Sequence, residues 1–296
     1  MSTTSPFGHV LTAMVSPMRA DGSLDLDSTL RLVAHLLDSG HDGIVVNGTT
    51  GESATLSDDE SIELVRVVAE AAAGRAAVVA GVGSNATAHS VEMARRAVDA
   101  GATGLLLVSP YYNKPTQAGL IAHCHAVADA TDLPVMLYDI PARTAIPFDT
   151  ATLVELAAHD RIVAVKDAKG DQWASTKVMA DTDLLYFSGD DSANLLWLAL
   201  GATGVVSVVG HVAGKDYAAM VAAVGRGDLD EARTIHRRLV PAVDAIMSPS
   251  QGAIMAKAAL VELGVIDHAT VRLPLVESPP EHLDTLRAGL KESGLL

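Results

Sequence analysis

The sequence predicts an α/β protein, a (β/α)8 barrel of the TIM type followed by a C-terminal helical appendage. Eight short apolar runs rich in β-branched residues occur between residues 10 and 209, and segments with helical periodicity separate them. No strand pattern follows residue 227. A strand followed by a helix, repeated eight times, is typical of a closed parallel barrel. A doubly wound open sheet is the alternative, but it gives no reason for eight such units in succession.

The strand candidates have the length and composition of strands buried on both faces of a parallel sheet. They span residues 10–15, 43–47, 76–81, 104–109, 134–138, 162–166, 184–188 and 204–209. The content of hydrophobic residues is 49% and that of aromatic residues only 3%, so the sequence predicts an aliphatic core.

The helices between these strands have recognisable ends. Residues 30–37 place apolar side chains at positions i, i+3, i+4 and i+7, and Gly40 follows as the stop signal. The next helix begins with a capping-box pattern from Ser57 to Glu60. We expect the acidic side chains of this first turn, Asp58 and Glu60 among them, to be solvated.

Residues 228–247, 252–263 and 280–290 are predicted to be helical. The predicted division is therefore a barrel domain, residues 1–227, that carries the active site, and a helical domain, residues 228–296. The second is expected to pack on the barrel or on a neighbouring subunit.

Charge and composition exclude several classes of partner. The formal net charge of the 296 residues is -15, which argues against nucleic acid or an anionic membrane surface as a partner. The single cysteine, Cys124, excludes an intramolecular disulfide framework and fits a reducing compartment. Without a signal peptide or an apolar run long enough to span a membrane, the chain is expected to be cytoplasmic.

Lys166 is the main catalytic candidate, because it ends an otherwise apolar strand run. Burial disfavours the charged form of a lysine, and a lysine that is partly neutral at pH 7 is a nucleophile. The alternative is a structural lysine paired with a carboxylate such as Asp167.

Other polar residues follow the carboxyl ends of the predicted strands, where barrels carry their active sites. Thr49 and Thr50, between two glycines, can bind a carboxylate with amides and hydroxyls, although a plain turn explains them equally well. Tyr111 and Tyr112 follow the fourth strand, and Tyr138 ends the fifth.

Arg143, in the loop after the fifth strand, can hold a carboxylate with two parallel hydrogen bonds. Loops seven and eight carry no lysine or arginine before Lys215, which argues against a phosphorylated substrate. The run His123 to His125 suggests a metal cluster, but neighbouring residues on a helix point in different directions.

Together these motifs resemble those of the dihydrodipicolinate synthase family of pyruvate-dependent class I aldolases. The resemblance covers essentially the whole chain and stands on runs in family order, which are Gly48-Thr49-Thr50-Gly51-Glu52, Tyr111-Tyr112-Asn113-Lys114-Pro115, Tyr138-Asp139-Ile140-Pro141-Ala142-Arg143-Thr144 and Val165-Lys166-Asp167. It implies condensation of pyruvate with L-aspartate 4-semialdehyde in lysine and diaminopimelate biosynthesis, without a metal or an organic cofactor. It also implies a homotetramer built from two tight dimers.

The resemblance assigns a role to each matching position. Lys166 would form a Schiff base with pyruvate, and Thr49, Tyr138 and a Tyr112 from the adjacent subunit would relay protons. Thr50 and Thr49 would bind the pyruvate carboxylate, and Arg143 the carboxylate of the semialdehyde. Gly189 and Val206 would contribute backbone groups.

Two rival functions remain open. Sister aldolases acting on N-acetylneuraminate or keto-deoxy sugar acids share the lysine, but the sialate lyases lack an arginine at position 143. A non-catalytic barrel that senses a metabolite is the other rival. Asp58, Ser61 and His89 depart from the residues with which lysine-inhibited relatives bind lysine, so we expect weak or absent feedback inhibition.

Overall fold

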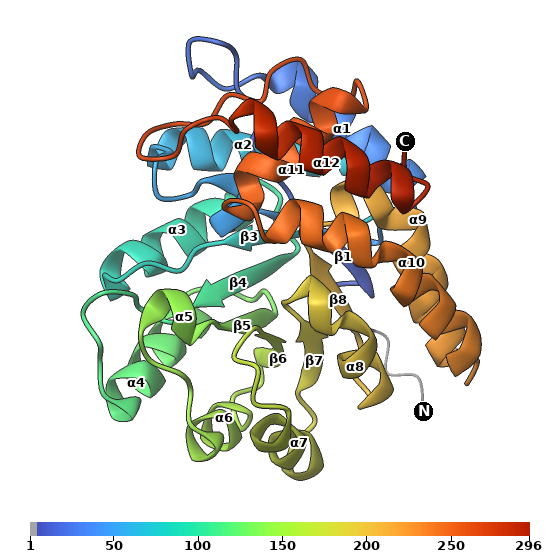
Figure 1. The fold of residues 1–296 in the computed structure, drawn as a ribbon. Helices are drawn as coiled ribbons and strands as arrows, with labels where there is room; N and C mark the ends of the chain where they lie inside the picture. The colour runs from blue at the N-terminus through green and yellow to red at the C-terminus, as the bar shows by residue number, and fades with distance from the viewer. Residues whose placement is uncertain (1–4) are drawn as a thin grey trace.

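The computed structural model describes residues 5–296 and contains a closed barrel of eight parallel strands in sequence order (Figure 1). The strands are β1 Val10–Ala13, β2 Gly43–Val46, β3 Ala77–Gly81, β4 Gly104–Val108, β5 Val135–Asp139, β6 Ile162–Asp167, β7 Leu185–Ser188 and β8 Gly204–Ser207. Because β8 pairs with β1, in the register Val10↔Val205, the barrel prediction is confirmed and the open sheet is excluded.

Helices alternate with the strands and cover the barrel. They are α1 Leu26–Asp38, α2 Asp58–Ala72, α3 Thr87–Asp99, α4 Gln117–Ala128, α5 Pro141–Thr144, α6 Thr150–Leu156, α7 Gln172–Asp181, α8 Asn194–Ala199 and α9 Gly210–Gly225, with short 3-10 helices η1 Thr49–Gly51 and η2 Asp191–Ala193. The predicted capping box is confirmed, because the Ser57 hydroxyl accepts from the Glu60 amide and the Glu60 carboxylate accepts from the Ser57 amide. Gly40 follows α1 with a φ of 87°.

The barrel has two hydrophobic layers, as its aliphatic composition predicts. Side chains that alternate along each strand point either into the barrel or toward the helices. The inner layer consists of Phe7, Leu11, Ala13, Val45, Val79, Leu106, Met136, Tyr138, Ala164, Phe187 and Val206. Residues such as Ile44, Leu105 and Val165 belong to the outer layer, between strands and helices.

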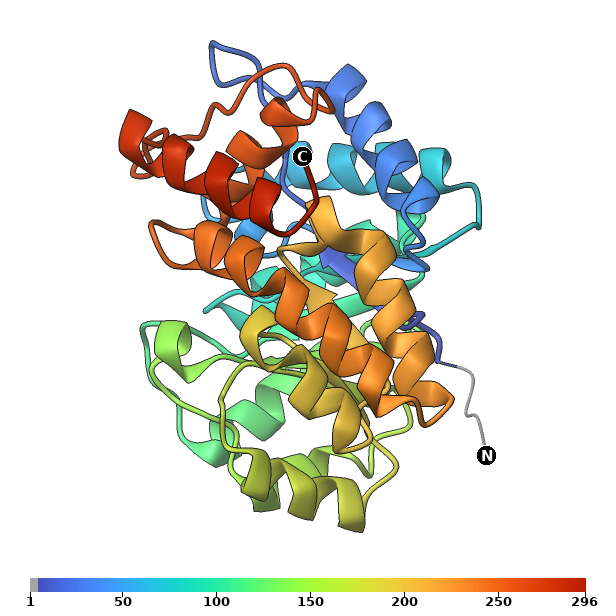
Figure 2. The ribbon, with the colours of Figure 1, turned by 45° about the vertical axis from the view of Figure 1, so that its right-hand side comes forward.

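The last three helices, α10 Leu229–Met247, α11 Gly252–Glu262 and α12 Pro280–Glu292, lie side by side against the barrel, next to α9 (Figures 1 and 2). Their buried side chains form one cluster with residues of α9 and of the strands β1 and β8. These helices therefore pack on their own barrel, the first of the two placements that the sequence left open. The predicted division at residue 227 stays a prediction.

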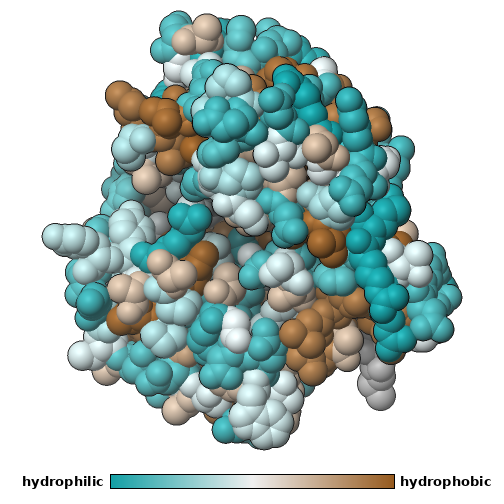
Figure 3. All heavy atoms as spheres, viewed as in Figure 1, coloured by the Kyte–Doolittle hydropathy of each residue, from teal (hydrophilic) through white to brown (hydrophobic). Residues whose placement is uncertain are grey.

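One face of the molecule is shown with its hydropathy in Figure 3, where hydrophobic patches are small and separated by hydrophilic residues. A patch at the upper left lies over the segment that joins α11 to α12, in which Leu273 is 77% exposed and Val276 is 64% exposed. Within residues 5–296, no helix is both long enough and apolar enough to cross a membrane.

Candidate active site

A one-residue bulge in β6 sets the position of Lys166. Val135 pairs with Ile162 but Met136 pairs with Ala164, so Val163 is an extra residue in β6. After the bulge, Tyr138 and Lys166 are direct partners across β5 and β6. Ala164 and Tyr138 face the barrel interior. Lys166, two residues after Ala164, shares its side of the strand.

The environment of Lys166 favours the neutral amine. The residue is 4% exposed, and its amine lies 4.1 Å from the centroid of the Tyr138 ring. Burial lowers the pKa of Lys166 to about 8, the Asp191 carboxylate opposes this shift, and the Arg143 guanidinium adds to it. About a tenth of the amine is therefore neutral and nucleophilic at pH 7, far more than for a lysine in water.

Tyr138 keeps its proton at neutral pH. Burial raises the pKa of its phenol to about 12, and the nearby Arg143 acts in the opposite direction. A neutral phenol both donates and accepts a hydrogen bond, which is what a residue that passes protons requires.

The structural alternative for Lys166, an ion pair with Asp167, is wrong. The Asp167 carboxylate accepts hydrogen bonds from the Ser175 hydroxyl at 2.6 Å and from the Lys169 amide at 2.9 Å. Successive residues of a strand point to opposite faces, so Asp167 lies on the helix side while Lys166 lies inside the barrel.

Gly189 lies against the stem of Lys166. A Cβ at Gly189 would lie 3.0 Å from Cγ and Cε of Lys166, so only glycine leaves room for the lysine there. The Gly189 amide donates to the Asp167 carbonyl at 2.7 Å, which leaves its carbonyl as the backbone group that can face a ligand. Val206 is a buried member of the barrel interior.

Thr49 and Thr50 lie in the short helix η1, directly after β2. Two residues with a left-handed backbone flank this helix, Asn47 with a φ of 58° and Glu52 with a φ of 56°. The carbonyl of Gly51 accepts a hydrogen bond from the Ser16 hydroxyl at 2.7 Å. Glu52, which follows η1, is 4% exposed, and its carboxylate pairs with the Lys257 amine.

A cavity of about 510 Å³ opens at this end of the barrel. Among the eight predicted site residues, Thr49, Tyr138 and Arg143 line it. Arg143 reaches it from α5, after β5. The structure thus brings together Thr49, which follows β2, and Arg143, which follows β5, at the carboxyl ends of the strands. Lys166 lies beside Tyr138.

Tyr112 does not join this group within its own chain. Its side chain is 88% exposed and its φ is 72°, whereas the neighbouring Tyr111 is 38% exposed and lines the cavity. An exposed tyrosine on a strained loop beside the site is available to another molecule.

Several site residues were missed or misjudged from the sequence. Asp191 is buried and accepts from the Val208 and Val209 amides at 2.8 Å and 3.0 Å and from the Ser207 hydroxyl, so it fixes the start of the loop after β8. The position of Asp191 after a strand was the only indication of this role in the sequence.

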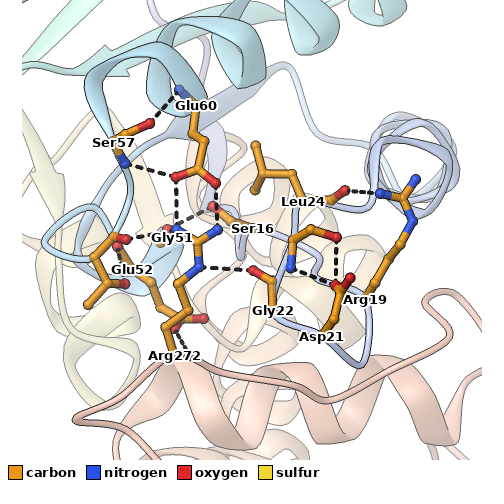
Figure 4. Close-up of polar contacts among 12 residues, drawn as sticks. Ser16, Arg19, Asp21, Gly22, Leu24, Gly51, Glu52, Ser57, Glu60 and Arg272 are labelled. Atoms are coloured by element: carbon orange, nitrogen blue, oxygen red, sulfur yellow. Dashed lines mark hydrogen bonds and ion pairs between the residues drawn. The ribbon is translucent and has the colours of Figure 1, made fainter.

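The expectation that Glu60 is solvated is wrong, because its carboxylate binds the Arg272 guanidinium (Figure 4).

The side chains of the run His123 to His125, which suggested a metal cluster, point into different surroundings. Cys124 is fully buried in the outer core, as predicted, His123 contacts the Thr87 hydroxyl at 3.0 Å, and His125 stacks on His159. Among the described residues, no group of three or more histidine, cysteine or acidic side chains is arranged to hold a metal ion.

A buried lysine of lowered pKa on the sixth strand of a barrel, beside a neutral tyrosine, defines an enzyme of the class I aldolase type. The chain belongs to the dihydrodipicolinate synthetase family, whose model matches residues 6–293.

Similar proteins agree with this assignment over nearly the full length. The chain is 57% identical over 290 residues to the 4-hydroxy-tetrahydrodipicolinate synthase of Kineococcus radiotolerans, covering 98% of this chain and 94% of the relative. It is 55% identical over 290 residues to that of Acidothermus cellulolyticus, with the same coverage. A crystal structure of the dihydrodipicolinate synthase of Cyanidioschyzon merolae with lysine bound superposes with a TM-score of 0.96 at 41% identity, covering 99% of this chain and all of the other.

Proposed function

We propose that this protein condenses pyruvate with L-aspartate 4-semialdehyde to form 4-hydroxy-tetrahydrodipicolinate, a step of lysine and diaminopimelate biosynthesis. The observation that carries the proposal is the buried amine of Lys166, with its pKa of about 8, beside the ring of Tyr138. The family of the chain and its similarity to 4-hydroxy-tetrahydrodipicolinate synthases support the choice of substrates.

In the first step the neutral amine of Lys166 attacks the ketone carbon of pyruvate, and water leaves to give an imine. The cationic imine withdraws electrons, so the pyruvate methyl group can lose a proton and become an enamine. The enamine carbon then forms a bond with the aldehyde carbon of the semialdehyde, whose oxygen takes up a proton, and the imine to Lys166 is restored. The amino group of the semialdehyde attacks the imine carbon, closes the ring and displaces the amine of Lys166, which leaves free.

Protons for these steps are passed along Tyr138, Thr49 and Tyr112. Tyr138 stands next to the amine on which the imine forms, and Thr49 lines the same cavity. Tyr112 would complete the relay in an adjacent subunit, a role that its 88% exposure supports.

The two substrate carboxylates are assigned to different elements. The hydroxyls and amides of Thr49 and Thr50 would bind the carboxylate of pyruvate, and Arg143 that of the semialdehyde. The Gly189 carbonyl and the backbone of Val206 would complete the wall behind the imine. A tyrosine supplied by a neighbour requires an oligomer, so a homotetramer built from two dimers is the proposed assembly.

The single cysteine, which is free and buried, supports a reducing compartment such as the cytoplasm. The departures at Asp58, Ser61 and His89 support weak or absent inhibition by lysine. All three line the large cavity, and His89 contacts Asp58 at 3.0 Å. Near-complete inhibition at sub-millimolar lysine would contradict this part of the proposal.

Borohydride reduction in the presence of pyruvate tests the chemistry. We expect a stable adduct on the peptide that contains Lys166 and none on the peptide of Lys257, which is also buried and serves as an internal control. An adduct elsewhere, or none, overturns the mechanism. Assays with the semialdehyde, N-acetylneuraminate and keto-deoxy-gluconate then separate the synthase from its sister aldolases.

A further inference from the structure

A second buried lysine lies outside the proposed mechanism. Lys257, on α11, is 0% exposed, and its amine donates to the Glu52 carboxylate and to the Thr270 carbonyl, the latter at 2.7 Å. Burial lowers the pKa of Lys257, and the charge of Glu52 opposes that shift. Burying two charges is costly, and removing either one leaves an uncompensated charge in the interior.

Arg272 extends the same network to the loop between β2 and α2. Its amide donates to the second carboxylate oxygen of Glu52 at 2.9 Å. Its guanidinium donates to the carbonyls of Gly22 and Thr55, at 2.9 Å and 2.8 Å, and to both carboxylate oxygens of Glu60 (Figure 4). Hydrogen bonding to Arg272 lowers the pKa of Glu60 to about 2, so this contact persists at working pH.

Glu52 joins this network to the substrate site. It directly follows η1, which carries Thr49 and Thr50, and its amide donates to the Thr49 carbonyl at 3.1 Å. Its left-handed backbone is unfavourable for a residue with a Cβ, and the contacts with Lys257 and Arg272 keep it there.

The same C-terminal segment also forms part of the cavity wall. Gln251, Pro274 and Leu275 line the cavity together with Thr49. The segment after the barrel therefore approaches the site from the side of η1. Tyr138 belongs to strand β5 and Lys166 to strand β6.

We infer that Lys257 and Arg272 are positioning residues for pyruvate, which act through Glu52 to orient the carboxylate-binding turn Thr49–Gly51. The inference rests on the proposed function, because it takes η1 as the pyruvate carboxylate site. Loss of the ion pair releases the end of η1 and weakens pyruvate binding. The chemical step slows as well, because Thr49 of η1 also belongs to the proposed proton relay, whereas binding of the semialdehyde by Arg143 on α5 changes little.

The test compares Lys257→Met with Leu286→Ala. Leu286 is a fully buried residue of α12 in the C-terminal cluster and makes none of the hydrogen bonds of the Glu52 network, so its variant destabilises the same helices without removing a partner of the ion pair. Steady-state kinetics with each substrate and thermal unfolding are measured for both. For Lys257→Met we expect the KM for pyruvate to rise about tenfold and kcat to fall, with the KM for the semialdehyde within about twofold.

Leu286→Ala is expected to unfold at a lower temperature with an unchanged KM for pyruvate. The inference is overturned if Lys257→Met keeps the parental KM for pyruvate, or if Leu286→Ala raises it equally. Should Lys257→Met not fold, Glu52→Gln replaces it in the comparison. This variant removes the charge that pairs with Lys257, while its amide oxygen still accepts a hydrogen bond from the Arg272 amide. Absence of a pyruvate adduct on Lys166 in the parent overturns the proposed function itself, whereas an adduct with unchanged KM values overturns only this inference.

Discussion

The amine of Lys166 lies 4.1 Å from the centroid of the Tyr138 ring, and the two residues are direct partners across β5 and β6. The bulge at Val163 makes them partners. In an unbroken register, Val165 would stand opposite Tyr138, and a shift of one residue moves a side chain to the other face of a strand. The proposed nucleophile and its proton-passing neighbour thus depend on one extra residue in β6.

The pH dependence of imine formation is expected to follow Lys166. Because burial lowers the pKa of Lys166 to about 8, the neutral amine predominates above that pH and is depleted below it. Well below pH 8, the rate constant for adduct formation with pyruvate should fall about tenfold for each pH unit. Borohydride trapping at a series of pH values measures this. A transition near the ordinary lysine pKa, about 10.4, would contradict the prediction.

Gly189→Ala is expected to disable the lysine. The new Cβ would lie 3.0 Å from Cγ and Cε of Lys166 and 2.9 Å from the Asp167 carbonyl, so the lysine side chain must move. We expect adduct formation to slow at least about tenfold, with about 1–3 kcal/mol lost from the free energy of unfolding. Gly225→Ala at the end of α9, where an added Cβ meets no atom within 4 Å, is the control. Equal adduct rates in both variants would refute the steric argument.

Tyr112→Phe should lower activity without affecting the stability of the chain. The residue is 88% exposed, so the free energy of unfolding should stay within about 0.5 kcal/mol of the parent, while loss of a proton relay lowers kcat about a hundredfold. Mixing subunits of Tyr112→Phe with subunits of Lys166→Ala should restore activity, because one hybrid site then has both residues. Mixtures of Tyr138→Phe with Lys166→Ala should stay inactive, since both residues serve the site of their own subunit. Failure of the first mixture to recover would place Tyr112 elsewhere.

Acid should destabilise the barrel through two buried histidines. Burial lowers the pKa of His41 to about 4 and that of His211 to about 3, and both rings accept or donate hydrogen bonds in the neutral form. Below about pH 6.5 the unfolded state binds protons that the folded state does not, so stability is complete above that pH and declines toward pH 4. Each histidine should cost about 2 kcal/mol at pH 5.

Denaturant unfolding of His41→Gln at several pH values checks this. Its stability should fall less steeply between pH 7 and pH 5 than that of the parent, by about one proton. Val276→Gln, at an exposed position without a titrating group, should keep the parental slope. An unchanged slope in His41→Gln would show that His41 is protonated in the folded state.

Periodicity predicted the fold because strand and helix patterns are local. The β-branched runs and the Ser57 capping box fix where elements begin, and each predicted strand agrees with the observed one to within two residues at either end. The carboxyl-end rule for barrels also selected Thr49, Tyr138, Arg143 and Lys166 without coordinates, because parallel strands present their ends at one rim.

Contacts between distant segments were not predictable in the same way. Glu60 was expected in water and instead binds Arg272, which follows it by more than two hundred positions, and nothing local in the sequence indicates that pairing. Lys257 was not predicted either: it is the single lysine of the mostly apolar helix Gly252–Glu262, and the sequence does not show which distant carboxylate it meets.

The sequence by itself determined the barrel, the order of its elements and the set of polar residues at its rim, since these follow from local pattern and from chain order. Tertiary structure alone decided that Lys166 faces Tyr138, that Tyr112 is exposed and does not line the cavity of its own chain, and that Lys257 contacts Glu52. The physical reason is that a register shift, a direction of exposure and a buried ion pair all depend on segments brought together only when the chain is packed.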